Sequence, residues 1–148
     1  MSIVTKKDFS IGVVVFYKSD EDVEYLLLKH KQGHWSFSKG HPDEDEKKLE
    51  TALRELREET GIRELVLLDK EPLLKEKYKF INKKSKYVLK NVEYFIAEVK
   101  DKTVIIDETE IIDFKWCSYQ IGLETITFKE SKNMLNEANI IIHKKFDV

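Results

Sequence analysis

The sequence predicts an α/β fold in which a mixed β-sheet is flanked by helices. β-Forming runs occur in both halves of the chain, while apolar residues recur at helical spacing before residue 61 and again near the C-terminus. Only two prolines and five glycines occur in 148 residues, and no repeat or low-complexity tract interrupts them. We therefore expect one compact domain spanning residues 1–148.

The first elements are two strands. Residues 11–17 form a β-branched run, residues 24–30 contain three consecutive leucines, and an acidic turn at 19–22 separates them. The same reasoning predicts further elements downstream: strands over 62–69, 87–99 and 111–116, a short helix over 119–124 and a C-terminal helix over 128–143.

A helix is predicted between these strands, ending at Gly61, which can take the left-handed conformation. Asp43 or Asp45 can cap its start, and Glu46 would lie in its first turn, where negative charge suits the helix dipole. Its core-facing positions are apolar: Leu49, Ala52, Leu53 and Leu56.

Three acids on this helix indicate metal binding. Glu55, Glu58 and Glu59 stand at i, i+3 and i+4, which brings their side chains to one face. Carboxylates this close repel one another, whereas a hard divalent cation requires several oxygen ligands. A solvated amphipathic helix with mixed charges is the alternative explanation of this spacing.

The residues around the acids form a longer pattern. It runs from Gly40 through Glu46, Arg54-Glu55-Leu56 and Glu58-Glu59 to Gly61-Ile62, with five, seven, one and one intervening residues. It resembles the signature of the Nudix hydrolases at every defined position. The resemblance implies an α/β/α sandwich that binds Mg²⁺ or Mn²⁺ and hydrolyses a nucleoside diphosphate linked to another group.

The resemblance also assigns roles within this pattern. It implies that Glu55, Glu58, Glu59 and the Gly40 carbonyl bind the metal. Arg54 and Glu46 would form a supporting pair, with Arg54 able to reach both Glu46 and Glu58. Because the metal neutralises phosphate charge and activates water, little covalent chemistry is required of the protein.

Most of the chain further resembles the asymmetric diadenosine tetraphosphate hydrolases of the animal and archaeal type, which produce ATP and AMP. The resembling stretches are residues 24–28, 34–41, 49–55, 94–99, 110 with 114–116, and 128–130. The chain departs from that family at Ser38, where proline is usual. The departure bears on substrate identity more than on chemistry.

Glu110 is the candidate acid outside the pattern. The resemblance aligns it with an acid that, in those hydrolases, contacts metal or water and can serve as general base. The choice between Glu55 and Glu110 for that role is open. Together with Asp107 and Glu108 it could instead form a solvated acidic turn.

Four cationic or imidazole side chains are candidate phosphate contacts: His34, Lys39, His41 and Lys90. Lys39 directly precedes Gly40, so its position beside the metal-binding loop is nearly forced. A solvated lysine and a structural histidine are the alternatives for Lys39 and His34.

Residues 75–90 carry seven lysines and one acid, interleaved with Tyr78, Phe80 and Tyr87. This composition suits either polyphosphate binding with base stacking, in which Phe128 is a further candidate, or a hairpin edge protected by lysines. Trp35 and Trp116 are expected in the core.

Composition restricts the class of protein. A net charge of −2 gives no general attraction to nucleic acid, and the single Cys117 excludes an internal disulfide and a cysteine metal cage. We expect a cytoplasmic monomer with a small nucleotide substrate and no membrane segment. The alternatives are another Nudix hydrolase, acting on RNA 5′ ends or on nucleoside diphosphate conjugates, a nucleotide-binding sensor without activity, and a purely structural domain.

Overall fold

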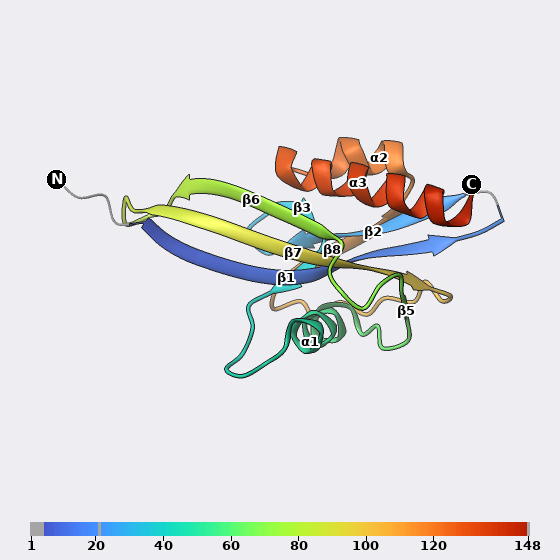
Figure 1. The fold of residues 1–148 in the computed structure, drawn as a ribbon, viewed down its shortest axis with the longest axis horizontal. Coiled ribbons are helices and arrows are strands. Elements are labelled where there is room, and N and C mark those ends of the chain that lie inside the picture. The colour runs from blue at the N-terminus through green and yellow to red at the C-terminus, as the bar shows by residue number, and fades with distance from the viewer. Residues whose placement is uncertain (1–4, 21, 148) are drawn as a thin grey trace.

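The computed structural model describes residues 5–20 and 22–147. One curved sheet lies between α1 on one side and α2 with α3 on the other, so the expected α/β/α sandwich is confirmed (Figure 1). The elements in chain order are β1 (Thr5–Lys18), β2 (Val23–His30), β3 (Trp35–Ser36), β4 (Ser38–Gly40), α1 (Lys48–Thr60), β5 (Val66–Leu67), β6 (Leu74–Ile81), β7 (Tyr87–Val99), β8 (Ile111–Cys117), α2 (Tyr119–Thr125) and α3 (Lys129–Phe146).

The centre of the sheet is a long parallel pair. β1 and β7 stay in register from Thr5 opposite Tyr87 to Tyr17 opposite Val99. The other pairings are antiparallel: β2 and β4 with β1, β5 and β6 with β7, and β3 and β8 with β2. The sheet is therefore mixed, as expected.

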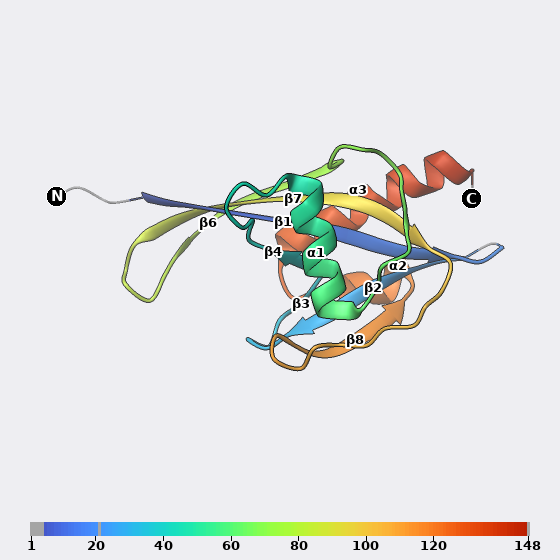
Figure 2. The same cartoon turned by 90° about the horizontal axis from the view of Figure 1, so that it is seen from below.

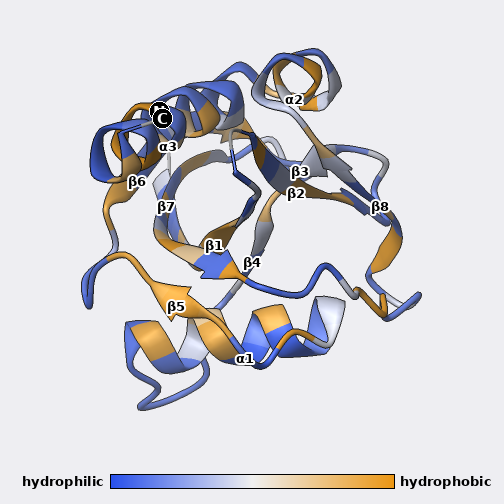
Figure 3. Ribbon diagram, turned by 90° about the vertical axis from the view of Figure 1, so that its right-hand side faces the viewer, coloured by the Kyte–Doolittle hydropathy of each residue, from blue (hydrophilic) through white to orange (hydrophobic). Residues whose placement is uncertain are grey.

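Each face of the sheet carries its own apolar core, which explains the continuous apolar runs of β1 and β7. Val13 and Val15 face α1, whereas Val14 and Phe16 face α2 and α3. Ala52 and Leu56 of α1 are buried, as their spacing predicted. The same sandwich is visible end-on with its hydropathy in Figure 3, which places α1 below the sheet and α2 and α3 above it.

Several element boundaries differ from the sequence predictions. β1 begins six residues earlier than expected because its polar first half pairs along β7. The strand expected over 62–69 shrinks to Val66–Leu67, where it meets only two residues of β7. The turn expected over 19–22 includes residue 21, outside the described range; Ser19 N donates to Asp22 O at 2.9 Å.

The predicted start of α1 is wrong. The helix begins at Lys48 with Lys47 as its N-cap, so neither Asp43 nor Asp45 caps it and Glu46 precedes its first turn. Asp45 adopts a positive φ of 62°, which directs the chain away from a helix at that point. The carboxylate of Glu50 instead accepts from Lys47 N at 3.0 Å.

β6 and β7 form a hairpin that projects beyond the helices (Figure 2). The Asn82 side-chain oxygen accepts from the backbone amides of Lys84 at 2.9 Å and Lys86 at 3.1 Å, closing its turn. All the lysines of residues 75–90 are exposed except Lys90, which fits a lysine-protected sheet edge. In the described part of the chain, no helix has the length and apolar character to cross a membrane.

Candidate metal and substrate site

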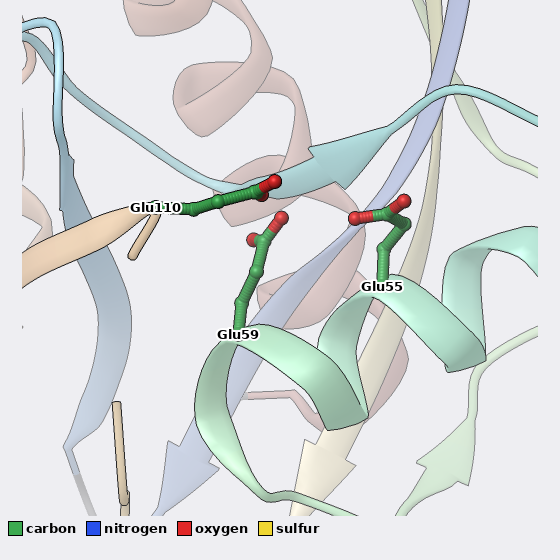
Figure 4. Close-up of side chains that lie close together, drawn as sticks. All are labelled: Glu55, Glu59 and Glu110. Atoms are coloured by element: carbon green, nitrogen blue, oxygen red, sulfur yellow. The ribbon is translucent and has the colours of Figure 1, made fainter. Parts of the chain in front are cut away.

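Three acids from two distant segments of the chain converge beside the second half of α1. Glu55 and Glu59 lie one helical turn apart, and Glu110 precedes β8; one carboxylate oxygen from each lies within 4.8 Å of the others. Figure 4 shows the three side chains pointing toward one another. Such a group offers the hard oxygen ligands that Mg²⁺ and Mn²⁺ prefer.

Backbone hydrogen bonds hold Glu110 against the helix. The amide of Ile105 donates to Thr60 O at 2.9 Å, which fastens the segment before Glu110 to the end of α1. The Glu110 carbonyl in turn accepts from Lys31 N at 2.8 Å. These two contacts bring a residue from the second half of the chain to the helix of the signature pattern.

The electrostatics of the group fit a cation. Glu59 is only 3% exposed, and its Oε1 has no hydrogen-bond partner among the described residues. Burial, reinforced by the negative charges of Glu55 and Glu110, raises the pKa of Glu59 to about 9. Burial also raises the pKa of Glu55. A divalent cation would give Glu59 Oε1 a partner and offset the repulsion among the three carboxylates. The residues present therefore fit the divalent metal predicted from the sequence.

Arg54 organises the loop before α1. Its Nε and Nη2 donate to the two carboxylate oxygens of Glu46 at 2.8 and 3.0 Å, which confirms the expected contact. Nη1 donates to Glu55 at 2.9 Å and to Glu58 at 3.2 Å, and Nη2 also donates to His41 O at 3.0 Å. Hydrogen bonds from Arg54 hold the pKa of Glu46 at about 2. Arg54 thus fixes the orientation of Glu55.

Glu58 and Gly40, the other two predicted metal ligands, lie outside the cluster of Glu55, Glu59 and Glu110. The Glu58 side chain is 53% exposed and pairs with Arg54, outside the three converging acids, although it borders a small hollow beside Glu59 and Glu110. Gly40 packs directly against the Glu55 carboxylate, so a Cβ at this position would collide with it. Metal binding by Glu58 and by the Gly40 carbonyl stays a prediction.

A cavity of about 1090 Å³ opens from the acids. Its lining includes Glu55, Glu59 and Glu110 together with all four predicted phosphate contacts: His34, Lys39, His41 and Lys90. Lys39 pairs with Gly12 through the β4–β1 ladder, but its ammonium group has no hydrogen bond or ion pair with the described residues, and burial lowers its pKa. The structure thus places the acids, two lysines and two histidines around one cavity, an arrangement that suits a metal-bound polyphosphate.

Aromatic side chains line the same cavity. His34 stacks on His30 with 4.6 Å between ring centroids and lies 5.4 Å from the ring of Phe128. Tyr78 and Phe80 form a second pair at 6.1 Å. These planar groups can contact a nucleotide base. Trp35 and Trp116 instead pack against the two apolar cores, as expected.

Sequence reasoning missed other residues that line the cavity, notably Asp8, Ser10, His30 and Glu130. Asp8 and Ser10 lie in a polar segment that carries no apolar strand signal. The alternation of Asp8 and Ser10 with Phe9 and Ile11, leading into the β-branched run, is the signal that could have extended the strand and placed both on one face.

Comparison with known proteins agrees with this geometry. The chain is 36% identical over 137 aligned residues to bis(5'-nucleosyl)-tetraphosphatase [asymmetrical] of Mus musculus, covering 86% of this chain and 90% of that protein. The Sus scrofa protein of the same name is 35% identical over equal coverage.

Solved structures show the same fold. The binary complex of a C. elegans Ap4A hydrolase superimposes with a TM-score of 0.78 at 24% identity, covering 93% of this chain and 98% of the other. The NUDIX domain of Shewanella oneidensis NrtR, complexed with ADP ribose, superimposes with a TM-score of 0.74 at 19% identity, covering 92% and 88%.

The model of the NUDIX domain matches residues 6–137, which span β1 to the middle of α3 and include every residue of the cavity described above. With most of its length matched by that model, the chain belongs to the NUDIX domain family.

Proposed function

We propose that this protein is a metal-dependent hydrolase of dinucleoside polyphosphates, acting on diadenosine tetraphosphate to produce ATP and AMP. The observation that carries the proposal is the shared cavity, in which three converging acids, several cationic side chains and two aromatic pairs surround one space. The names of the mouse and pig relatives support the same substrate.

Glu55, Glu59 and Glu110 would hold Mg²⁺ or Mn²⁺, with Glu58 and the Gly40 carbonyl as further oxygen donors. The bound ion would neutralise phosphate charge and lower the pKa of the attacking water. Arg54 keeps Glu55 in a fixed orientation through its hydrogen bond at 2.9 Å. Glu55 and Glu110 both lie at the acid group, and either carboxylate can accept the proton of that water.

The remaining side chains of the cavity would bind the substrate. Lys39 and Lys90 offer ammonium donors to phosphate oxygens, and His41 lies beside them on the rim. Tyr78 and Phe128 present aromatic surfaces on which an adenine can stack. The size of the cavity, about 1090 Å³, suits a ligand larger than a mononucleotide.

The test is chromatography of the products formed from diadenosine tetraphosphate with and without Mg²⁺. Equal amounts of ATP and AMP, only with metal, are expected; two molecules of ADP would contradict the asymmetric cut. Turnover of 5′-triphosphorylated RNA in place of the dinucleotide would favour the RNA alternative. A strong salt dependence of RNA binding would then support RNA contacts by the exposed lysines of the β6–β7 hairpin.

Single variants test the metal ligands. Glu58→Gln and Glu59→Gln are each expected to reduce turnover by orders of magnitude with an unchanged fold, and Glu64→Gln, an exposed acid outside the cavity, is the matched control. Near-wild-type activity of both Glu58→Gln and Glu59→Gln would refute the metal assignment.

A further inference from the structure

The polar first half of β1 forms part of the cavity wall. The sheet register sets Asp8 opposite Lys90 in the parallel β1–β7 pair and Tyr78 opposite Lys90 in the antiparallel β6–β7 pair. Residues in register on neighbouring strands project to the same face, so these three side chains form one row. Ser10 follows two residues after Asp8 on the same face and also lines the cavity.

Asp8 and Ser10 together hold the ammonium group of Lys90. Lys90 Nζ donates to Asp8 Oδ2 at 2.9 Å and to Ser10 Oγ at 2.6 Å, and its side chain is only 8% exposed. An ammonium group has three N–H donors. Among residues 5–20 and 22–147, no acceptor is found for the third donor, so one N–H of Lys90 is left for a ligand in the cavity.

The second carboxylate oxygen of Asp8 reaches the loop before α1. His41 Nε2 lies 2.9 Å from Asp8 Oδ1, and His41 O accepts from Arg54 Nη2 at 3.0 Å. Burial alone would raise the pKa of Asp8, but the hydrogen bond and charge of Lys90, followed by those of His41, outweigh it and lower the pKa. Asp8 is therefore ionised at neutral pH and joins Lys90, through His41 and Arg54, to the helix that carries the acids.

We propose that Asp8 is a positioning residue for the polyphosphate chain: with Ser10 it orients the Lys90 ammonium toward a phosphate oxygen and keeps His41 beside it. This inference rests on the proposed function, because it assumes a polyphosphate ligand. Simple charge repulsion would have the Asp8 carboxylate weaken phosphate binding, whereas the positioning role has it strengthen that binding. Replacing Asp8 by a neutral residue therefore separates positioning from repulsion by the sign of the effect.

The probe is inorganic tripolyphosphate, titrated by calorimetry in EDTA so that no metal contributes. Asp8→Asn retains the shape of the side chain but loses its charge-assisted hydrogen bonds, and we expect about ten-fold weaker binding. Ser10→Ala removes one neutral acceptor and should weaken binding by about three-fold. The matched control is Glu24→Gln, which removes an acid of similar exposure (33% against 29%) from an ion pair with Lys102 outside the cavity and should leave affinity unchanged.

Kinetics supply the second readout. Asp8→Asn should raise the KM for diadenosine tetraphosphate about ten-fold while kcat stays within about two-fold, because Asp8 affects substrate binding rather than the reacting atoms. If the wild type does not turn over this substrate, the proposed function fails, whereas the tripolyphosphate titrations still decide the role of Asp8.

Tripolyphosphate affinity in Asp8→Asn equal to or tighter than that of the wild type would overturn the proposal, as would absence of wild-type binding. If Asp8→Asn does not fold, Ser10→Ala decides: weakened binding supports positioning, and unchanged affinity rejects it.

Discussion

Replacing Glu59 by glutamine should make the metal-free protein more stable while abolishing its metal-dependent activity. Glu59 is 3% exposed, lies within reach of Glu55 and Glu110, and has an oxygen without a partner among the described residues. Its position therefore costs folding free energy in the absence of a cation. A glutamine side chain has nearly the same shape, and its amide N–H groups can donate to the neighbouring carboxylates.

The magnitude follows from the pKa of Glu59, which burial raises from 4.5 to about 9. The folded state keeps the proton in this range while the unfolded state loses it, so stability falls as pH rises from 4.5 toward 9. At about pH 7.5 the difference of about three pH units corresponds to about 4 kcal/mol. Because a proton on Glu55 relieves part of the same repulsion, we expect Glu59→Gln to recover between about 1 and 4 kcal/mol.

Urea denaturation in EDTA measures this gain. Glu59→Gln and the wild type should have similar free energies of unfolding near pH 5, and the variant should become more stable as the pH approaches about 7.5. Glu64→Gln, an exposed acid, should show no such gain. Added Mg²⁺ should stabilise the wild type more than the variant, since the proposed metal site needs the Glu59 carboxylate. A variant less stable than the wild type in EDTA at about pH 7.5 would refute this reasoning.

Three further predictions concern other parts of the site. Burial, followed by the charge of neighbouring His34, lowers the pKa of His30 from 6.5 to about 4. The free energy of unfolding should therefore fall by about 3 kcal/mol as the pH drops from 6.5 to about 4. Urea denaturation of the wild type and His30→Gln across this range checks it, and an identical pH dependence of the two proteins would contradict it. Gly40→Ala should displace Glu55 and weaken metal binding, measured by Mg²⁺ titration of turnover; an unchanged Mg²⁺ requirement would contradict the contact. Arg54→Lys loses the bidentate contact with Glu46 and should lower kcat by about ten-fold or more. Steady-state rates equal to those of the wild type would exclude a role for Arg54 in orienting Glu55.

The spacing of the acids on α1 was predictable because helix geometry determines it, and the reach of Arg54 back to the segment before the helix was predictable from its position. Glu55 and Glu59 are four residues apart, and the eight-residue separation of Glu46 and Arg54 allowed the contact that the structure contains. The cap of α1 was not predictable in this way, since two aspartates precede the helix but the structure has Lys47 at the cap, with Asp45 at a positive φ.

The position of Glu110 depends on contacts between distant segments. Periodicity near Glu110 indicates only an acidic turn before a strand, and its convergence with Glu59 requires the hydrogen bonds that fasten this turn to α1 and to the loop after β2. Resemblance to a known family identified Glu110, whereas the residues themselves did not. Helical spacing placed Glu58 with the other acids, yet its carboxylate lies on Arg54.

The position of Asp8 follows from the register of the β1–β7 pair and could not be predicted from composition. Residues 5–10 contain three charged side chains, and by composition they do not read as part of a strand that continues into a buried core. In the sheet they pair with β7 over their whole length, so the charge of Asp8 falls directly opposite that of Lys90. A buried lysine requires a nearby anion or acceptor, and β1 supplies both from one face, two residues apart. The polar half of β1 is therefore matched to the cavity as its apolar half is matched to the core, and a shift of one residue in the β1–β7 register would remove both matches at once.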